Sequence, residues 1–489
     1  MTRLNWQVIL PALALVLVAA GLGMAVCLGV ALAYGDGATR AFALSTGISL
    51  ALAAAAYWGS RRFAPAPFRA RDGFFAVTAA WLLAAVIGAL PFLFAGTFSR
   101  TPGAFFESMS GFTTTGATLI GDIEAQPHAI LLWRSLTQWI GGIGFIVLVV
   151  AVAPATGLVS QRFFYAETSG VTAERLTPRI ADTAKIIWGI YLVLTTAGFL
   201  AYVLAGMSPF EAVNHIFTTV ATGGFSTRGP SIADFDSLGI EIVAIVFMML
   251  GGVNFAFYWR AIRGGDPAFP QLAEVRAYLV ILAGASLAVA VSLLAAGDAD
   301  GVGEALRSGS FTVVSITTTT GYTTADFDLW NDFARTALLA LMFVGGCAGS
   351  TAGGLKVVRI MLLAQSAGQE IKRQLQPKSV QVLRIRRRVF SEEIRRNILG
   401  FFYIYMLVFA AATIALTAAG LDIVSAASGA AATLNVIGPG LGVIGAVENY
   451  EAVPSAALWV LDACMLIGRL EVFTVLVLLV PAFWRRGRS

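Results

Sequence analysis

The stretch TTTTGYTT, residues 317–324, places a run of hydroxyl side chains and one glycine in a chain that is mostly hydrocarbon. Of its 489 residues, 57% are hydrophobic and only 12% are charged, whereas soluble domains carry about 25% charged residues. The composition therefore predicts an integral membrane protein. A polar stretch at membrane depth must then be enclosed by protein or line a wet cavity.

The apolar segments around this stretch are long enough to cross a bilayer, which takes roughly 20 residues per helix. Backbone in lipid has to satisfy its own hydrogen bonds, and these segments are too long for barrel strands, so we expect an all-α polytopic membrane protein. The segments are residues 4–34, 41–59, 73–99, 135–160, 186–206, 242–258, 278–297, 337–355 and 398–420, which carry no charge, and 456–484, which carries Asp462, Arg469 and Glu471.

Basic residues gather on alternate connections between these segments, and acidic residues on the others. The longest basic connection spans residues 364–397, others lie near residues 60–72, 162–185 and 260–276, and the chain ends in RRGRS. Because positive residues stay on the cytoplasmic side, we expect both termini there. This alternation favours membrane topology over nucleic-acid binding. Anionic lipid headgroups are one possible contact for the basic connections.

Four connections on the acidic side share a design, which predicts an internal repeat. Each is small, apolar or rich in hydroxyls and then reaches a glycine; the connections are residues 106–120, 211–227, 307–324 and 422–442, with Gly116, Gly223, Gly321 and Gly438. The next helix carries glycine in the second place of GGIGF (141–145), GGVNF (251–255), GGCAG (345–349) and IGRLE (467–471). We expect two extra helices in residues 1–60, then repeats at 61–160, 161–260, 261–365 and 366–489.

These connections are too apolar for solvated loops, so we expect each to re-enter the membrane as a short helix and an extended stretch. Four pseudo-symmetric copies around a central pore could present main-chain carbonyls that replace the water shell of a cation. Ordinary turns at the membrane surface are the alternative. The expected filter residues are Thr114, Thr115, Gly116, Ala221, Thr222, Gly223, Thr319, Thr320, Gly321, Val436, Ile437 and Gly438. Ile437 breaks the threonine pattern, so the support behind the fourth copy must differ.

The segment GGCAGSTAGG, residues 345–354, predicts a break in the last helix of the third repeat. Each glycine inside a helix costs about 1 kcal/mol relative to alanine. A packing ridge of small residues does not need five glycines, so this segment weakens the helix more than packing alone would explain. We expect an unwound, mobile loop below the filter, anchored by Lys356. Its residues are Gly345, Gly346, Cys347, Ala348, Gly349, Ser350, Thr351, Ala352, Gly353 and Gly354.

Arg469 occupies a deep position in the last helix. It precedes the terminal basic cluster by sixteen residues, or roughly 24 Å of helix, which is too far for its side chain to reach the surface. An ionisable residue at this depth is a functional candidate. We expect Arg469 to face the cavity below the filter as a barrier to cations; a structural ion pair is the alternative. Asp462 could attract cations or lie at a solvated helix end.

The chain resembles the TrkH family, the membrane subunits of bacterial Trk potassium uptake systems in the Trk/Ktr/HKT superfamily. The resemblance rests on TTTGA (113–117), ATGGF (221–225), TTTGY (318–322), VIGPG (436–440) and GGCAGSTAGG (345–354). It implies potassium uptake across the bacterial inner membrane, a homodimer, gating by residues 345–354, and a cytosolic TrkA-type ring that binds NAD or ATP. A glycine at each filter position implies K+ rather than Na+. Transported K+ is the only ligand implied for this chain, without an organic cofactor.

Other functions stay open on the residues alone. A secondary K+ symporter coupled to protons or sodium, or a less selective Na+/K+ transporter, would share the broken helices, although four parallel repeats favour a pore. An intramembrane protease could use Ser350, but both histidines fall on the opposite, outward side from it, so we expect no enzyme. His215 is expected to be a packed histidine rather than a proton site.

Overall fold

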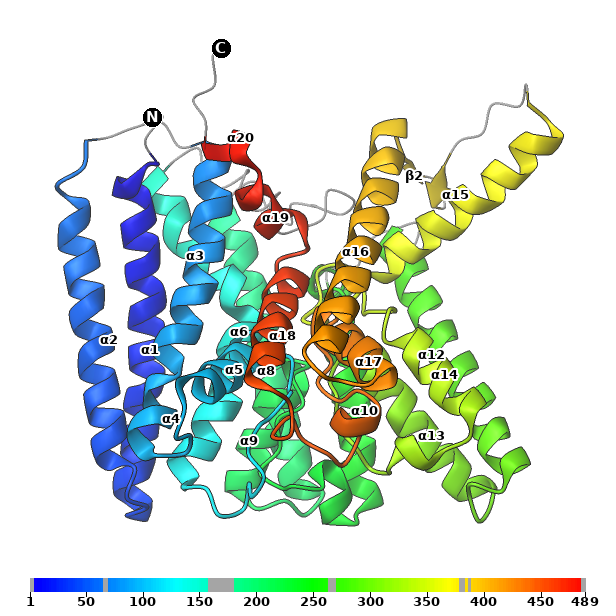
Figure 1. Cartoon of the computed structure of the whole chain (residues 1–489), viewed down its shortest axis with the longest axis horizontal. Helices are drawn as coiled ribbons and strands as arrows, with labels where there is room; N and C mark the ends of the chain where they lie inside the picture. Colours follow the sequence, from blue (N-terminus) through cyan, green and yellow to red (C-terminus); the bar gives the residue numbers. More distant parts are fainter. Residues whose placement is uncertain are drawn as a thin grey trace.

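The computed structural model describes residues 4–64, 69–156, 180–262, 270–377, 383–385 and 388–484. These form a nearly all-helical protein with several long apolar helices, which confirms the predicted all-α membrane class (Figure 1). The described residues add one two-residue antiparallel strand pair, β1 (Arg384–Ile385) and β2 (Arg388–Val389). Parts of the basic connections, residues 162–179, 378–382 and 386–387, lie outside the described part, and so does the basic end, residues 485–489.

Two helices lie before α3 in the chain. Helices α1 (Trp6–Tyr34) and α2 (Thr39–Ser60) form a hairpin, and the hydroxyl of Ser49 donates to the Leu17 carbonyl 2.7 Å away across it. Helix α1 also packs on α3 and α6 of the first repeat. Gly35 ends α1 in the left-handed conformation that favours glycine. The hairpin therefore covers one flank of the first repeat rather than forming a separate domain.

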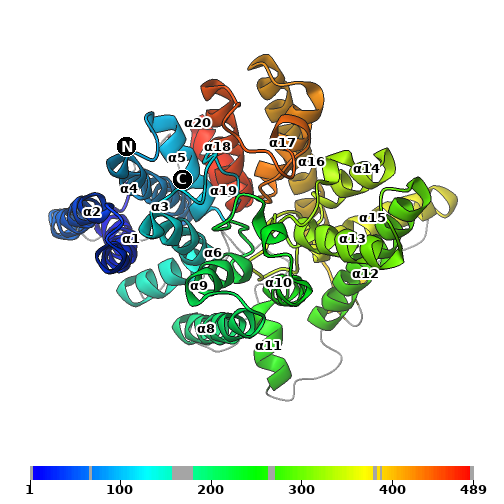
Figure 2. The ribbon, with the colours of Figure 1, turned by 90° about the horizontal axis from the view of Figure 1, so that it is seen from below.

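Each repeat begins with a membrane-spanning helix and continues with a short pore helix. The spanning helices are α3 (Ala70–Gly88) with α4 (Leu90–Ala95), α8 (Ile180–Leu204), α12 (Pro270–Ala296) and α16 (Glu392–Ala418). The pore helices are α5 (Thr101–Phe112), α9 (Pro209–Val220), α13 (Val302–Thr317) and α17 (Ile423–Leu434). They surround the loops at the centre of the molecule (Figure 2). Short 3-10 turns, Ser231–Phe235, Phe327–Leu329 and Gly442–Ile444, follow three of the pore segments.

Local sequence signals mark the start of three of these helices, α5, α9 and α17. Ser208 and Glu211 form a reciprocal capping box on α9, and the Asp422 carboxylate accepts from two backbone N–H groups of α17. Proline lies in the first turn of α5 and of α9, where its missing N–H has no cost. These signals fix where α5, α9 and α17 begin, and the segments that follow all four helices lie at the centre (Figure 2).

The helix after each pore segment is continuous only in the first repeat, as α6 (His128–Thr156). In the second, α10 (Leu238–Gly251) and α11 (Phe255–Ile262) meet at 89°. In the third, residues 342–356 separate α14 (Asp332–Leu341) from α15 (Val357–Leu375), and in the fourth a three-residue break separates α18 (Ser455–Arg469) from α19 (Phe473–Leu479). The break in the third repeat is the one that the glycine-rich segment 345–354 predicts. Continuous helices over 242–258 and 456–484 were wrong expectations, because a bend and strained backbone interrupt them.

Among the described residues, six helices, or seven if the α10–α11 pair counts as one span, are long and apolar enough to cross a membrane. Helix α1 starts and α20 (Pro481–Trp484) ends on the same face, toward which α15 also projects (Figure 1). The pore helices occupy the opposite half. This arrangement places the start and end of the described chain on one side.

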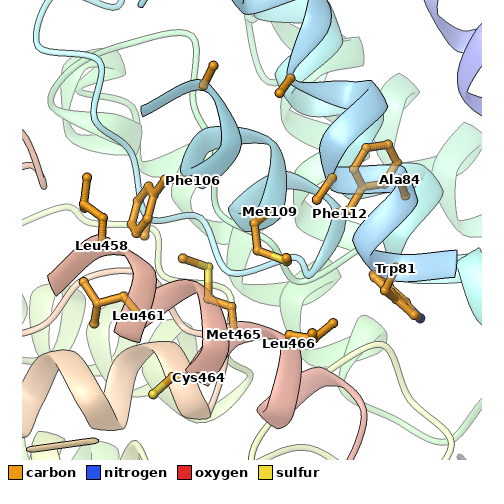
Figure 3. Packing of buried hydrophobic residues seen from close by; sticks show 14 of the residues in the cluster. Trp81, Ala84, Phe106, Met109, Phe112, Leu458, Leu461, Cys464, Met465 and Leu466 are labelled. Carbon is orange, nitrogen blue, oxygen red and sulfur yellow. The ribbon is translucent and has the colours of Figure 1, made fainter. Parts of the chain in front are cut away.

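The first and fourth repeats pack through a wedge of large apolar side chains. Phe106 and Met109 on α5 lie beside Leu458, Leu461 and Met465 on α18 (Figure 3). All five are buried. This contact joins the last repeat to the first, so the repeats enclose the centre of the molecule.

Candidate functional site

The four pore segments adopt the same unusual backbone. After each pore helix, the chain turns left-handed twice, with one intervening residue. The first left-handed residues are Thr114, Thr222, Thr319 and Val436, with φ of 58°, 52°, 58° and 53°, and the second are Gly116, Gly224, Gly321 and Gly438, with φ of 83°, 79°, 81° and 102°. A non-glycine residue rarely holds φ above zero, and such strain clusters at functional sites.

The second segment corrects the expected register by one residue. The intervening residue donates its N–H to the carbonyl five residues earlier in every copy: Thr115 to Ser110, Gly223 to Thr218, Thr320 to Ser315 and Ile437 to Ala432, at 2.8–2.9 Å. Gly224, not Gly223, therefore matches Gly116. The pair of adjacent glycines in ATGGF allows both alignments, and only the backbone conformation separates them.

The segments meet in chain order and close a ring. A β-carbon on any of the four left-handed glycines would enter the backbone of the next copy. A β-carbon on Gly116 would lie 2.1 Å from the carbonyl oxygen of Gly223, and one on Gly224 would lie 1.9 Å from that of Thr320. The corresponding distances are 1.8 Å from Gly321 to the Ile437 oxygen and 2.8 Å from Gly438 to the Thr115 oxygen. Glycine is required here for space as well as for its positive φ. All twelve expected filter residues lie in this ring, and Gly224 completes it.

Hydroxyl pairs support the ring in the first and third copies. Thr113 and Thr115 lie 2.8 Å apart at their Oγ1 atoms, and so do Thr318 and Thr320. The fourth copy has Asn435 and Ile437 at these places. There the Tyr405 hydroxyl donates to the Asn435 side chain, and the Tyr450 hydroxyl donates to the Gly438 carbonyl at 2.6 Å. The different support expected behind Ile437 is thus supplied by two tyrosines.

Residues 345–354 form an unwound loop directly below the ring, as their glycine content predicts. Val344 and Leu355 pair as a parallel bridge that closes the loop. The Gly353 N–H donates to the Thr319 hydroxyl at 2.7 Å, and a β-carbon on Gly353 would lie 2.1 Å from Val436. The loop therefore contacts the third and fourth extended segments of the ring.

The loop and the break in the second repeat satisfy each other's backbone groups. Cys347 N–H donates to the Gly252 carbonyl at 2.8 Å, and Phe255 N–H donates to the Gly349 carbonyl at 3.1 Å. The Thr351 hydroxyl lies 2.9 Å from the Val220 carbonyl and 3.1 Å from that of Gly251. Unpaired backbone groups are costly in a membrane interior, so the two interruptions stabilise one another.

Arg469 joins the loop to the ring. Its guanidinium donates to the Thr351 carbonyl at 2.9 Å, to the Gly141 carbonyl at 2.9 Å and to the Thr114 hydroxyl at 3.0 Å. The residue is partly exposed rather than fully buried. Its positive charge thus lies against the first extended segment of the ring, next to the loop.

Residues next to the start of α15 also hold the loop. Lys356 is buried, and its ammonium donates to the Ala352 carbonyl, so it links the end of the loop to the start of α15. The buried Glu274 carboxylate accepts from the Ala348 N–H at 2.7 Å. Arg359, in the first turn of α15, forms a 2.5 Å ion pair with Glu471 in the break of the fourth repeat.

Comparisons with known proteins agree with this geometry. A family model described as "TrkH: Cation transport protein" matches residues 39–280 and 298–486. The chain is 41% identical over 465 residues to the Trk system potassium uptake protein TrkH of Salmonella typhimurium, covering 93% of this chain and 94% of the relative. It is 40% identical over 488 residues to the protein of the same name from Halomonas elongata, covering 99% and 100%. The crystal structure of the potassium transporter TrkH from Vibrio parahaemolyticus matches with a TM-score of 0.88 and 39% identity, covering 99% of this chain and 100% of that one.

The chain belongs to the TrkH family of cation transport proteins. The family model spans the ring, the unwound loop and Arg469. The resemblance carried by the glycine motifs is therefore confirmed over nearly the whole chain.

A buried ion pair behind the ring escaped the sequence analysis of this TrkH-family chain. Glu107 on α5 and Arg134 on α6 are each 1% exposed, and Arg134 Nε lies 2.8 Å from Glu107 Oε1. Arg134 also donates to the Ser226 carbonyl at 2.9 Å, and its guanidinium lies 4.2 Å from the Phe225 ring centroid. The pair links the first and second repeats. The sequence did carry a signal for this pair, because charged residues inside a membrane helix bundle are rare and are usually paired.

Three other candidates take ordinary or unexpected positions. The two ring nitrogens of His215 lie 2.8 Å from the Glu211 carbonyl and 2.9 Å from the Ser226 hydroxyl, which is the packed arrangement expected. Ser350 donates to the Cys347 carbonyl at 2.7 Å. Asp462 is only 3% exposed, so the solvated-helix-end alternative was wrong; α5 and α17 cover this helix.

Proposed function

We propose that this TrkH-family chain mediates potassium uptake through a channel-like pore whose selectivity filter is the ring of four extended segments. The observation that carries the proposal is the closed contact between those segments at Gly116, Gly224, Gly321 and Gly438. Main-chain oxygens from such a ring can replace the hydration shell of K+. Relatives named as potassium uptake proteins, 40–41% identical to this chain, support K+ as the transported ion.

The pore helices assist cation binding in this proposal. All four end at the ring, so the partial negative charge of their C-termini lies at its inner side. A cation that has passed the ring would be stabilised there. This field and the neutral main-chain ligands suit a monovalent ion that must bind and then leave.

The proposed gate is the loop of residues 345–354 with its anchor Lys356. It lies beneath Thr319 and Val436, so its withdrawal would open the way from the ring toward the inner side. Arg469 is the proposed barrier: its charge at the inner end of the ring repels cations and its bond to Thr351 holds the loop in place.

A cytosolic, nucleotide-binding TrkA-type ring is the proposed regulator. Helix α15 starts directly after the loop and projects from the body, with Ile371 68% and Leu375 80% exposed. A partner that moves α15 would pull on the loop. We also propose a homodimer in the bacterial inner membrane with both termini cytoplasmic, repeats at residues 61–160, 161–260, 261–365 and 366–489, and a transport rather than an enzymatic role.

Ion flux into vesicles tests this function. Purified protein reconstituted in liposomes should take up Rb+ and K+ at rates that follow the applied voltage, with much slower Na+ uptake. Adding a proton or sodium gradient at constant voltage should leave the K+ rate unchanged. A K+ rate that follows either gradient would instead establish a coupled symporter, and equal Na+ and K+ rates would establish a less selective transporter.

A further inference from the structure

The second filter segment lacks the side chains that support the others. In the first and third segments, paired threonine hydroxyls lie behind the ring, 2.8 Å apart. The second segment has Ala221 and Gly223 at the same two places, neither of which offers a hydrogen bond from its side chain. Something outside the segment has to hold its backbone.

Gln138 of α6 occupies that place. The side chain is fully buried; its Nε2 donates to the Gly223 carbonyl at 2.6 Å and its Oε1 accepts from the Phe225 N–H at 3.1 Å. A β-carbon on Gly223 would lie 2.4 Å from Gln138 Cδ. The amide of Gln138 therefore fills the volume that Thr115, Thr320 and Ile437 side chains fill in the other copies.

The chemistry of an amide suits this task. It offers a donor and an acceptor on one planar group, so it can hold a carbonyl and an N–H at once. A carbonyl oxygen has two lone pairs, so the bond from Gln138 leaves one for a cation at the ring. Neither leucine nor glutamate can supply the donor at similar size. One helical turn away, Arg134 holds the Ser226 carbonyl from the same face of α6.

We propose that Gln138 is the positioning residue that sets K+ selectivity at the second filter segment, with its amide replacing the missing threonine pair. The inference rests on the proposed function, since it assumes that the ring selects the ion. A ring with one loosely held wall can contract around a smaller cation, so losing Gln138 admits Na+. Gln138 and Gly223 then form a matched pair, in which a larger residue at 223 requires a smaller one at 138.

The first test compares Gln138→Leu, which keeps the volume and loses both hydrogen bonds, with the control Ser135→Ala on the same helix. Ser135 is buried but donates only within α6, to Leu131. In liposomes, the ratio of K+ to Na+ uptake should fall about tenfold for Gln138→Leu, as expected when two hydrogen bonds to the filter backbone are lost. The ratio should not change for Ser135→Ala. An unchanged ratio in Gln138→Leu would overturn the inference.

The second test asks whether a smaller residue at position 138 compensates for a larger one at position 223. It remains informative even if Gln138→Leu does not fold. Gly223→Thr alone should reduce uptake, since its side chain overlaps the amide, whereas Gly223→Thr combined with Gln138→Ala should recover uptake and selectivity toward the wild type. Recovery by the pair supports the inference, and a pair no better than Gly223→Thr contradicts it. Wild-type protein without K+ uptake would refute the proposed function itself, a result distinct from either.

Discussion

Gly224 and its three counterparts satisfy two conditions at once, a left-handed backbone and the absence of a β-carbon. Gly224→Ala places a methyl group 1.9 Å from the Thr320 oxygen at φ 79°. A left-handed non-glycine residue alone costs about 1–2 kcal/mol, and the overlap adds to it. We expect K+ uptake to fall at least about tenfold.

Gly239→Ala is the matched control for Gly224→Ala. Gly239 lies in α10, and the nearest atom to its added methyl would be 3.7 Å away. Alanine favours a helix over glycine by roughly 0.5–1 kcal/mol, so uptake should be unchanged. Equal loss in both variants would mean that the ring geometry is not what Gly224 provides.

Arg469 allows a separate prediction about flux. Arg469→Ala removes a positive charge from the inner end of the ring and the bond to Thr351. We expect single-channel conductance and basal flux to rise. Arg469→Lys keeps the charge but not the three hydrogen bonds. Its conductance and basal flux should lie between those of the wild type and Arg469→Ala. Unchanged conductance in Arg469→Ala would remove its barrier role.

Glu211, in the first turn of α9, allows a prediction about the pH dependence of stability. Partial burial disfavours a charged Glu211, but hydrogen bonds from Arg228 and Ser208 outweigh it and lower the pKa below the ordinary value of 4.5. A carboxyl with a lowered pKa stabilises the fold above its ordinary value and loses that contribution as the pH falls through the folded pKa. Melting temperature should therefore drop below pH 4.5 in the wild type more than in Glu211→Gln. Parallel curves for the two proteins would show that this cap is not coupled to pH.

At the scale of elements, the loop is tied to the fourth repeat through Arg359 and Glu471. These side chains are 6% and 18% exposed, and Arg359 also lies 3.9 Å from the Phe401 ring centroid. Glu471 and Val472 hold φ of 54° and 59°, so the break in the fourth helix is strained. Removing one partner of a buried pair costs about 3–5 kcal/mol, because the other charge is left alone.

Arg359→Met and Glu471→Gln should each lower the unfolding temperature and raise basal K+ flux, because the start of α15 and the loop are released. The double variant should cost less than the sum of the two single variants. Additive effects would show that the pair does not couple α15 to the fourth repeat.

The sequence was sufficient for the helices and for the glycine-rich interruption at residues 345–354, but not for the breaks between α10 and α11 and between α18 and α19. Long apolar segments and caps such as Ser208 define helices through local physics. The bend at α10–α11 depends instead on hydrogen bonds from Cys347 and to Gly349, about a hundred residues away in the chain. The one-residue shift at Gly223 has a similar origin, because both glycines fit locally and only contact with the third segment selects Gly224.

At the scale of the whole molecule, the four copies share a backbone but not their supports. Threonine pairs hold the first and third segments, Gln138 contacts the second, and Tyr450 contacts the fourth. The repeat pattern predicted the ring because the backbone geometry is common to all four copies. It could not predict Gln138, Tyr450 or Arg134, because each reaches the ring from another element.

Locating the bound ion tests the central claim most directly. Crystals of the protein grown in Rb+ should show an anomalous peak on the axis of the ring, surrounded by main-chain oxygens of residues 114–116, 222–224, 319–321 and 436–438. Replacing Rb+ with Na+ should remove this peak. Rb+ found only at side-chain carboxylates outside the ring, with none on the axis, would contradict the account.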